Sequence, residues 1–224
     1  MRRLSLLMLL ALGCDKPAPP PFPDGFLFGA ATAGFQVDPG CPTLPESECV
    51  DTHSDWYQWV TSANELSDLS SLITFEPLAH APGYWELYDQ DFARAKNELG
   101  LNALRVSIEW SRIFPTATDG LEGDALAAAA NPAALAGYHA QLAAMKARGL
   151  TPLVTLNHYT LPLWIHDGVA CHQDLTSPAC VAAKGWLDQP RTVREIAKYA
   201  GFVAKEFGCE VDYWATENEP FAVV

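Results

Sequence analysis

The stretch YDQDFARAKNELGLNALRVSIEWSRIFP, residues 88–115, decides the fold class, because a helical pattern in it is followed directly by a strand pattern. Phe92, Ala95 and Leu99 recur three and four residues apart, which predicts a helix with one apolar face turned inward. Gly100 supplies the left-handed residue with which helices commonly end. Residues 102–110, NALRVSIEW, then have the apolar content of a buried strand.

The same alternation continues on both sides of this stretch. Residues 26–35, 150–159 and 211–218 are the other predicted strands. A helix over residues 131–149 is predicted to end at Gly149 and to bury Leu135, Tyr138, Leu142 and Met145. A third helix, residues 191–208, is predicted to turn inward Val193, Ile196, Ala197, Ala200 and Ala204. Strands that alternate with helices predict an α/β fold with a parallel sheet.

The composition is that of a globular protein with an acidic surface. Of the 224 residues, 49% are apolar and 18% are charged, which allows a sizeable core. Asp and Glu outnumber Lys and Arg by 27 to 14, and the net charge is -13. This charge disfavours nucleic acid as a partner and leaves neutral or cationic small molecules open.

The N-terminus has the layout of an export signal. Two arginines precede a largely apolar run, residues 4–12, and the segment ALGC ends at Cys14. Such a run is too short to cross a bilayer as a helix, which takes about 20 residues. We interpret residues 1–14 as a signal peptide of the bacterial lipoprotein type with Cys14 lipidated, and residues 15–25 as a proline-rich tether. The predicted location is the cell envelope, either lipid-anchored or periplasmic and secreted; ordinary signal cleavage and a retained N-terminus are the alternatives.

Export places the cysteines in an oxidising compartment, where local pairs can close. Close spacing suggests disulfides between Cys41 and Cys49 and between Cys171 and Cys180, with Cys209 left over. A metal site built from Cys171, His172 and Cys180 is the alternative, but no second ligand pair supports it. Both suggested pairs fall within the two long loops, residues 38–82 and 167–190. These loops follow strand ends, where parallel barrels form their active sites.

Four blocks of the sequence resemble one family. They are FLFGAATAGFQ (residues 26–36), residues 88–115, YHAQLAAMKARGLTPLVTLNHYTLPLWIHDG (residues 138–168) and WATENEP (residues 214–220). In this order they resemble the N-terminal half of glycoside hydrolase family one, the beta-glucosidase and beta-galactosidase family, and DWYQWV and GWLDQPRTV resemble its archaeal-type branch. The resemblance implies a (β/α)8 TIM barrel of which residues 26–224 form about the first four strands. It also implies a beta-linked glycoside as substrate and no cofactor or metal. We expect the chain to be a fragment or a truncated gene product.

The resemblance assigns Glu219 as the acid/base of a retaining glycosidase, which needs one carboxyl group to protonate the leaving oxygen and another to attack the sugar. Strict strand alternation would put Glu217 on the face of Glu219 and Asn218 on the other, so Glu217 is the alternative candidate. The family pattern requires the chain to leave strand geometry at Glu219. Pro220 favours such an exit, because proline restricts the preceding residue and cannot donate to a ladder.

The resemblance also implies supporting residues around the acid/base. Gln36, His158 and Asn218 are expected to bind the sugar, and Arg105 is expected to lie beneath the nucleophile and to be poorly satisfied without it. We expect Glu109 and Arg112 to pair structurally and Trp110 and Trp164 to lie near the pocket.

The sequence contains no candidate for the nucleophile. The resemblance implies that the nucleophile lies in an ENG-type motif on a later strand of the barrel. The chain is therefore interpreted as the acid/base half of an exported retaining beta-glycosidase. Its predicted partners are its substrate and, through lipidated Cys14, a membrane. The alternative is a lipid-anchored protein that binds carbohydrate without hydrolysis.

Overall fold

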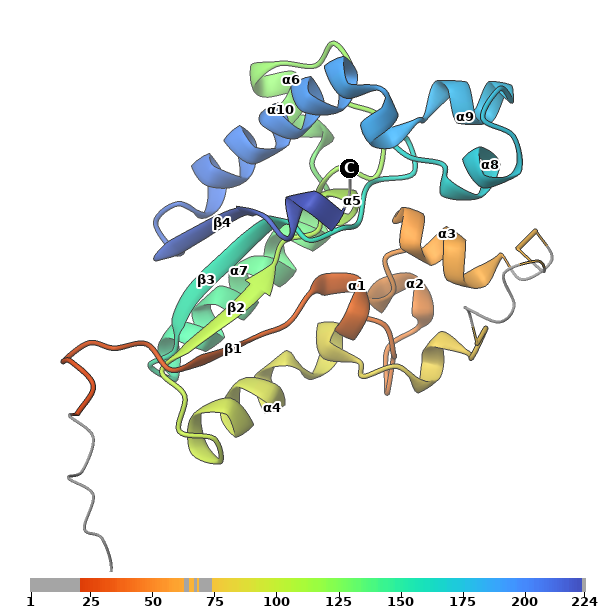
Figure 1. The fold of residues 1–224 in the computed structure, drawn as a ribbon. Coiled ribbons are helices and arrows are strands. Elements are labelled where there is room, and N and C mark those ends of the chain that lie inside the picture. Colours follow the sequence, from red (N-terminus) through yellow and green to blue (C-terminus); the bar gives the residue numbers. More distant parts are fainter. Residues whose placement is uncertain (1–20, 63–64, 67, 69–73, 223–224) are drawn as a thin grey trace, which may run out of the picture.

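The computed structural model describes residues 21–62, 65–66, 68 and 74–222, which form a four-stranded parallel sheet with helices packed against it (Figure 1). The strand order is that of the sequence, and the strands are β1 (Gly29–Ala31), β2 (Ala103–Ser107), β3 (Thr151–Asn157) and β4 (Tyr213–Glu217). The longer helices are α4 (Tyr84–Asn97), α7 (Pro132–Ala147) and α10 (Gln189–Phe207). The shorter ones are α1 (Gly34–Val37), α2 (Glu46–Cys49), α3 (Asp55–Thr61), α5 (Trp110–Ile113), α6 (Gly123–Ala129), α8 (Gly168–Gln173), α9 (Pro178–Ala182), η2 (Leu78–His80), η3 (Gly185–Leu187) and η4 (Pro220–Ala222).

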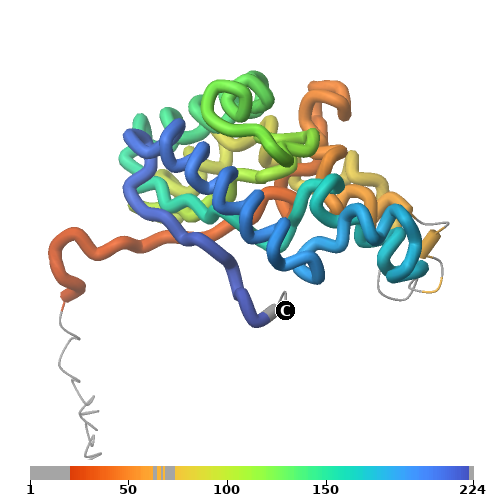
Figure 2. The backbone as a smooth tube through the Cα atoms, turned by 90° about the horizontal axis from the view of Figure 1, so that it is seen from above, coloured from red at the N-terminus to blue at the C-terminus, as the bar shows by residue number. Residues whose placement is uncertain are grey.

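The two faces of the sheet have different chemistry. Leu104, Val106 and Val154 are buried with apolar side chains of α4, α7 and α10 in one hydrophobic core. Arg105 and Thr155 alternate with these residues and meet on the opposite face. β4 runs along the lower side of the molecule, away from the segments of α6 and α7 (Figure 2). No helix in the described ranges is long and apolar enough to cross a membrane.

The predicted order of helices and strands is confirmed, with three local corrections. β1 covers only Gly29–Ala31, and Gly34 and Phe35, predicted as the end of that strand, begin the helix α1 (Gly34–Val37). Leu99 is 69% exposed, because α4 ends at Asn97 and the side chain lies beyond its buried face. Gly100 and Gly149 adopt the predicted left-handed conformation, with φ of 67° and 64°.

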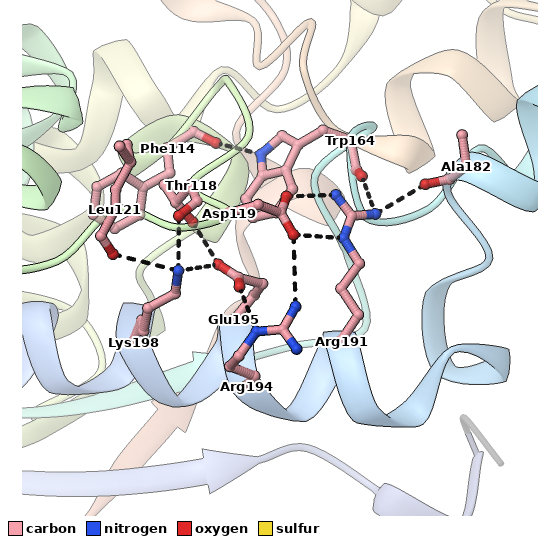
Figure 3. Close-up of polar contacts among 10 residues, drawn as sticks. All are labelled: Phe114, Thr118, Asp119, Leu121, Trp164, Ala182, Arg191, Arg194, Glu195 and Lys198. Atoms are coloured by element: carbon pink, nitrogen blue, oxygen red, sulfur yellow. Dashed lines mark hydrogen bonds and ion pairs between the residues drawn. The ribbon is translucent and has the colours of Figure 1, made fainter.

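The third correction concerns the buried face of α10. Its buried residues are Thr192, Glu195, Tyr199, Val203 and Phe207, whereas Val193, Ala197 and Ala204 are exposed. The helical period was right, but the inward face was only partly right: Ile196 and Ala200 are half-buried against the core, whereas the fully buried Glu195 was not predicted. The carboxylate of Glu195 pairs with Lys198 at 2.6 Å and with Arg194 at 3.0 Å (Figure 3). A buried charge is tolerated only with such partners.

The two suggested disulfides are present, and each lies within one of the long loops. Cys41 bonds Cys49, and Cys171 bonds Cys180 with a Cα–Cα distance of 4.7 Å, while Cys209 is free and exposed. Because both sulfurs of the second pair are used, the alternative metal site is ruled out. The predicted lipidation site Cys14 lies outside the described residues.

The two disulfide-bearing loops pack against each other. Helix α3 of the first loop contacts α8 of the second, and the ring of Trp59 meets that of His172 edge to face. The carboxylate of Asp55 holds Nδ1 of His166 at 2.8 Å across the same junction. These contacts lie beyond the carboxyl ends of the strands (Figure 1).

Candidate active site

Polar side chains from three neighbouring strands meet at the carboxyl end of the sheet. Arg105 of β2 donates through Nε to Thr155 Oγ1 of β3 at 2.6 Å. It also donates through a terminal nitrogen to Asn218 Oδ1, just beyond β4, at 3.0 Å. Arg105 therefore joins β2, β3 and the end of β4 on the face opposite the hydrophobic core.

Arg105 is better satisfied than the sequence suggested, since two neutral oxygens accept its protons. Across the described ranges no carboxylate lies within ion-pair distance of this guanidinium. Its positive charge is therefore balanced by dipoles rather than by an anion, although the group is partly buried. The site can accommodate a negative charge next to Arg105.

Glu219 lies where the strand geometry has ended, as predicted. β4 stops at Glu217, the Asn218 amide donates to Asn157 O at 3.0 Å, and Glu219 has φ of 50°. This left-handed conformation is uncommon for a glutamate and redirects its side chain relative to the strand. The hydroxyl of Tyr159 donates a hydrogen bond to the carboxylate of Glu219, which is exposed to solvent.

His158 contributes a neutral imidazole to the same group. Burial and the positive charge of Arg105 lower the pKa of His158, while the negative charge of Glu219 opposes the shift. Its Nδ1 is enclosed and has no hydrogen-bond partner among the described residues. An enclosed, unpaired ring nitrogen can bind a hydroxyl group of a ligand.

Glu217 differs from Glu219 in its surroundings. It is paired in register with Asn157, and burial raises the pKa of Glu217 to about 7. One of its carboxylate oxygens is enclosed and has no hydrogen-bond partner in the described part of the chain. Glu217 therefore has the acid strength expected of a proton donor near neutral pH, but Glu219 has the contacts with the polar group.

Gln36 is the predicted site residue that the structure does not bring into contact with the others. It is exposed on α1, directly after β1. No hydrogen bond joins it to Arg105, His158, Asn218 or Glu219 in the ranges that the structure describes. It does lie at the same end of the sheet, because α1 follows the carboxyl end of β1 (Figure 1).

Glu109 links the loops that follow β1 and β3. Its carboxyl group accepts from the hydroxyl of Ser107 at 2.6 Å and from the hydroxyl of Thr160. Ser107 in turn accepts from the backbone N–H of Gly34 at 2.7 Å. Glu109 is buried, and burial together with the nearby negative charge of Asp38 raises the pKa of Glu109 to about 7. Through its hydrogen bonds to Ser107 and Thr160, Glu109 fixes the backbone next to Gln36 and Tyr159.

The predicted pairing between Glu109 and Arg112 is wrong. Arg112 instead forms a buried ion pair with Asp38 at 3.1 Å and donates to Cys49 O at 2.8 Å. Its guanidinium also lies 3.9 Å above the ring of Trp85. Asp38 and Cys49 lie in the long loop after β1, so Arg112 anchors that loop to the core.

Of the two tryptophans expected near the pocket, Trp110 is a core residue and Trp164 is half-buried against the core. Trp110 is 2% exposed and stacks on Tyr199, and Trp164 packs edge to face on Trp110 and donates to Phe114 O. Trp56 is the tryptophan that lies next to the candidate site, since its ring stacks on that of Tyr159 with centroids 6.0 Å apart. The sequence did not predict this role of Trp56, because the segment DWYQWV, residues 55–60, has no apolar period that indicates which of its rings are buried.

The described side chains contain no group of three His, Cys, Asp or Glu residues that could hold a metal ion. The candidate site thus consists of carboxyl, amide, imidazole, phenol and guanidinium groups. Parallel strands with such groups at their carboxyl ends place the chain among α/β proteins, in which small molecules bind at this end of the sheet.

Residues 18–224 match Glycosyl hydrolase family 1, and the chain belongs to this family. It is 36% identical to a beta-galactosidase of Pyrococcus woesei over 91% of this chain and 42% of that protein. It is 34% identical to a beta-galactosidase of Saccharolobus solfataricus, over 90% of this chain and 42% of that protein. The crystal structure of a hyperthermophilic beta-glucosidase from Pyrococcus furiosus superposes with a TM-score of 0.77 at 35% identity, covering 90% of this chain and 44% of the other. The chain therefore spans less than half the length of these relatives and has the first four strands of their (β/α)8 barrel.

Proposed function

We propose that the chain supplies the acid/base half of a retaining beta-glycosidase, with Glu219 as the proton donor. The observation that carries this proposal is the meeting of Arg105, His158, Asn218 and Glu219 at the carboxyl ends of neighbouring parallel strands. The family membership and the relatives named beta-galactosidase and beta-glucosidase support the same reaction.

In this reaction Glu219 protonates the glycosidic oxygen as the bond to the anomeric carbon breaks, and later takes a proton from water. Tyr159 holds the carboxyl group in place through its hydrogen bond. A second carboxylate must attack the anomeric carbon, about 5 to 5.5 Å from the first. We propose that it comes from the part of the barrel that the relatives have beyond the region they share with this chain. There Arg105, which has no carboxylate partner in the described chain, would stabilise its negative charge.

The sugar would be held by neutral hydrogen-bonding groups. His158 offers an enclosed ring nitrogen, Asn218 offers an amide that is already oriented by Arg105, and Gln36 offers an exposed amide from α1. Fixed donors and acceptors of this kind discriminate among sugars, because a buried group left unpaired costs about 1 to 3 kcal/mol.

Two measurements test this function. Sequencing the DNA downstream of codon 224 is expected to reveal a second half with an ENG-type motif. The 224-residue chain alone is expected to give no turnover of 4-nitrophenyl beta-glucoside. Substantial turnover that Glu219→Gln abolishes would instead place the nucleophile within residues 1–224 and contradict the proposed division.

A second function, carbohydrate binding without hydrolysis, is favoured by one observation. Arg105 has only neutral acceptors in the described ranges, so this part of the site has groups for binding but no second carboxylate beside the guanidinium. A stop codon directly after codon 224 would favour this function. Binding of methyl 1-thio-beta-glucoside without turnover of any aryl glycoside would support it further.

We also propose export and lipidation at Cys14, supported by the apolar run before ALGC. The segment lies outside the described residues. Labelling cells with an alkyne fatty acid should mark the wild-type protein and not Cys14→Ser. Equal labelling of both proteins would exclude this site.

A further inference from the structure

A cavity of about 590 Å³ lies between the two disulfide-bearing loops, next to the candidate active site. Its lining includes Trp56, Trp59, Val60, Thr74 and His166. None of the residues assigned to the reaction lines it. Its position beside Trp56, rather than on the sheet itself, separates it from the groups proposed to bind the sugar.

Two indole rings and one valine form the apolar part of the lining. The carboxylate of Asp55, which also borders the cavity, already accepts from the Leu161 backbone N–H at 2.9 Å and is bonded to His166 Nδ1 at 2.8 Å. The remaining ring nitrogen of His166 has no partner among the described residues. The ring faces of Trp56 and Trp59, together with Val60, suit an apolar planar group.

The cavity is connected to Glu219 through two stacked rings. Trp56 lines the cavity and lies parallel to Tyr159, with 4° between the planes and 6.0 Å between the centroids. Tyr159 donates its hydroxyl hydrogen bond to Glu219. A leaving group whose oxygen lies at Glu219 must therefore extend past the Tyr159 ring before it reaches the cavity.

We propose that this cavity binds the far end of an elongated apolar aglycone, with Trp56 and Trp59 as the platforms that select a second aromatic ring. The proposal rests on the proposed function, since the aglycone is placed by the leaving oxygen at Glu219. It adds a specificity site formed by the loops after β1 and β3, because α3 belongs to the first and His166 to the second.

The test is the binding of three thioglycosides, which resist hydrolysis, to the natural gene product that contains residues 1–224, by ligand-observed NMR and isothermal titration. The probes are methyl, phenyl and 4-biphenylyl 1-thio-beta-D-glucopyranoside. We expect the biphenylyl compound to bind about tenfold more tightly than the phenyl compound, because its outer ring is removed from water. The methyl and phenyl compounds should differ less.

Two variants and one control assign the effect to the cavity. Trp59→Ala removes one platform, and Val60→Trp fills the cavity without deleting a side chain; both should abolish the biphenylyl preference and leave the Kd of the methyl compound unchanged. Trp186→Ala removes another partly buried indole, outside the lining, and should retain the preference.

Equal affinity of the wild type for the phenyl and biphenylyl compounds would overturn the proposal alone. So would a preference that survives in both Trp59→Ala and Val60→Trp. Failure of all three compounds to bind would overturn the sugar site as well, and with it the placement of the aglycone.

Discussion

The most informative perturbation of stability is Glu109→Gln. Burial and the charge of Asp38 raise the pKa of Glu109 to about 7 from an ordinary value of 4.5. The folded chain therefore keeps a proton that the unfolded chain releases between about pH 4.5 and pH 7. Because the unfolded state binds fewer protons in this window, the free energy of unfolding falls as the pH rises through it.

The magnitude follows from the gap between the two pKa values, about 2.5, at about 1.4 kcal/mol for each pH unit. Glu109 alone should cost the wild type about 3 kcal/mol of stability between pH 4.5 and pH 8, relative to a residue that does not titrate. Glutamine can keep both hydrogen bonds of Glu109, since its amide oxygen can accept from the hydroxyl of Ser107 or Thr160 and its amide NH2 can donate to the other hydroxyl.

The assay is urea denaturation followed by circular dichroism, at several values from pH 5 to pH 8. We expect Glu109→Gln to be more stable than the wild type at pH 8 and to show a flatter pH dependence. Glu122→Gln, at an exposed carboxylate, serves as the matched control and should parallel the wild type. Parallel curves for the wild type and Glu109→Gln would refute the inference that Glu109 is protonated in the folded chain.

Two further substitutions test the anchoring of the loop after β1. In Gly34→Ala the added Cβ would lie 2.2 Å from Glu109 Oε1, so we expect a loss of about 1–3 kcal/mol, whereas Gly201→Ala, with open space around the new Cβ, should gain up to about 1 kcal/mol. Urea denaturation measures both, and equal effects would contradict the close approach of Gly34 to Glu109. Asp38→Ala should cost about 3–5 kcal/mol because it leaves Arg112 buried without its anionic partner; a loss below about 1 kcal/mol in the same assay would show that the pair does not stabilise the loop.

Local signals in the sequence predicted the elements of the fold. Gly100 and Gly149 end helices with positive φ because only nearby residues determine a helix stop. The disulfides within the loops followed from short sequence separations, 8 and 9 residues. The barrel type itself was predicted from the resemblance, since four strands alone are compatible with several parallel folds.

Features that depend on distant partners were not predicted. Glu195 is buried because Lys198 and the loop residue Thr118 complete its bonds, and Thr118 lies 77 positions away. The stacking of Trp56 on Tyr159 likewise joins two different loops. Periodicity records which face of a helix is apolar, but it does not record which polar residue finds a partner after folding.

The backbone geometry at Glu219 could be predicted from the sequence, but the hydrogen bond to its carboxylate could not. The motif predicted that the chain leaves strand geometry before Pro220, and φ of 50° at Glu219 confirms that it does. The hydrogen bond from Tyr159 to Glu219 depends on the left-handed conformation of both residues, which their spacing in sequence does not reveal.

The central claim, that Glu219 rather than Glu217 is the proton donor, is tested most directly by azide rescue in the natural gene product that contains residues 1–224. We predict that Glu219→Gln lowers turnover of 4-nitrophenyl beta-glucoside by about 10² to 10⁴, and that sodium azide restores it with formation of beta-glucosyl azide, because this anion attacks without a general base. Glu217→Gln should stay within about tenfold of the wild type and show no rescue. Rescue of Glu217→Gln, together with unimpaired turnover by Glu219→Gln, would contradict the assignment.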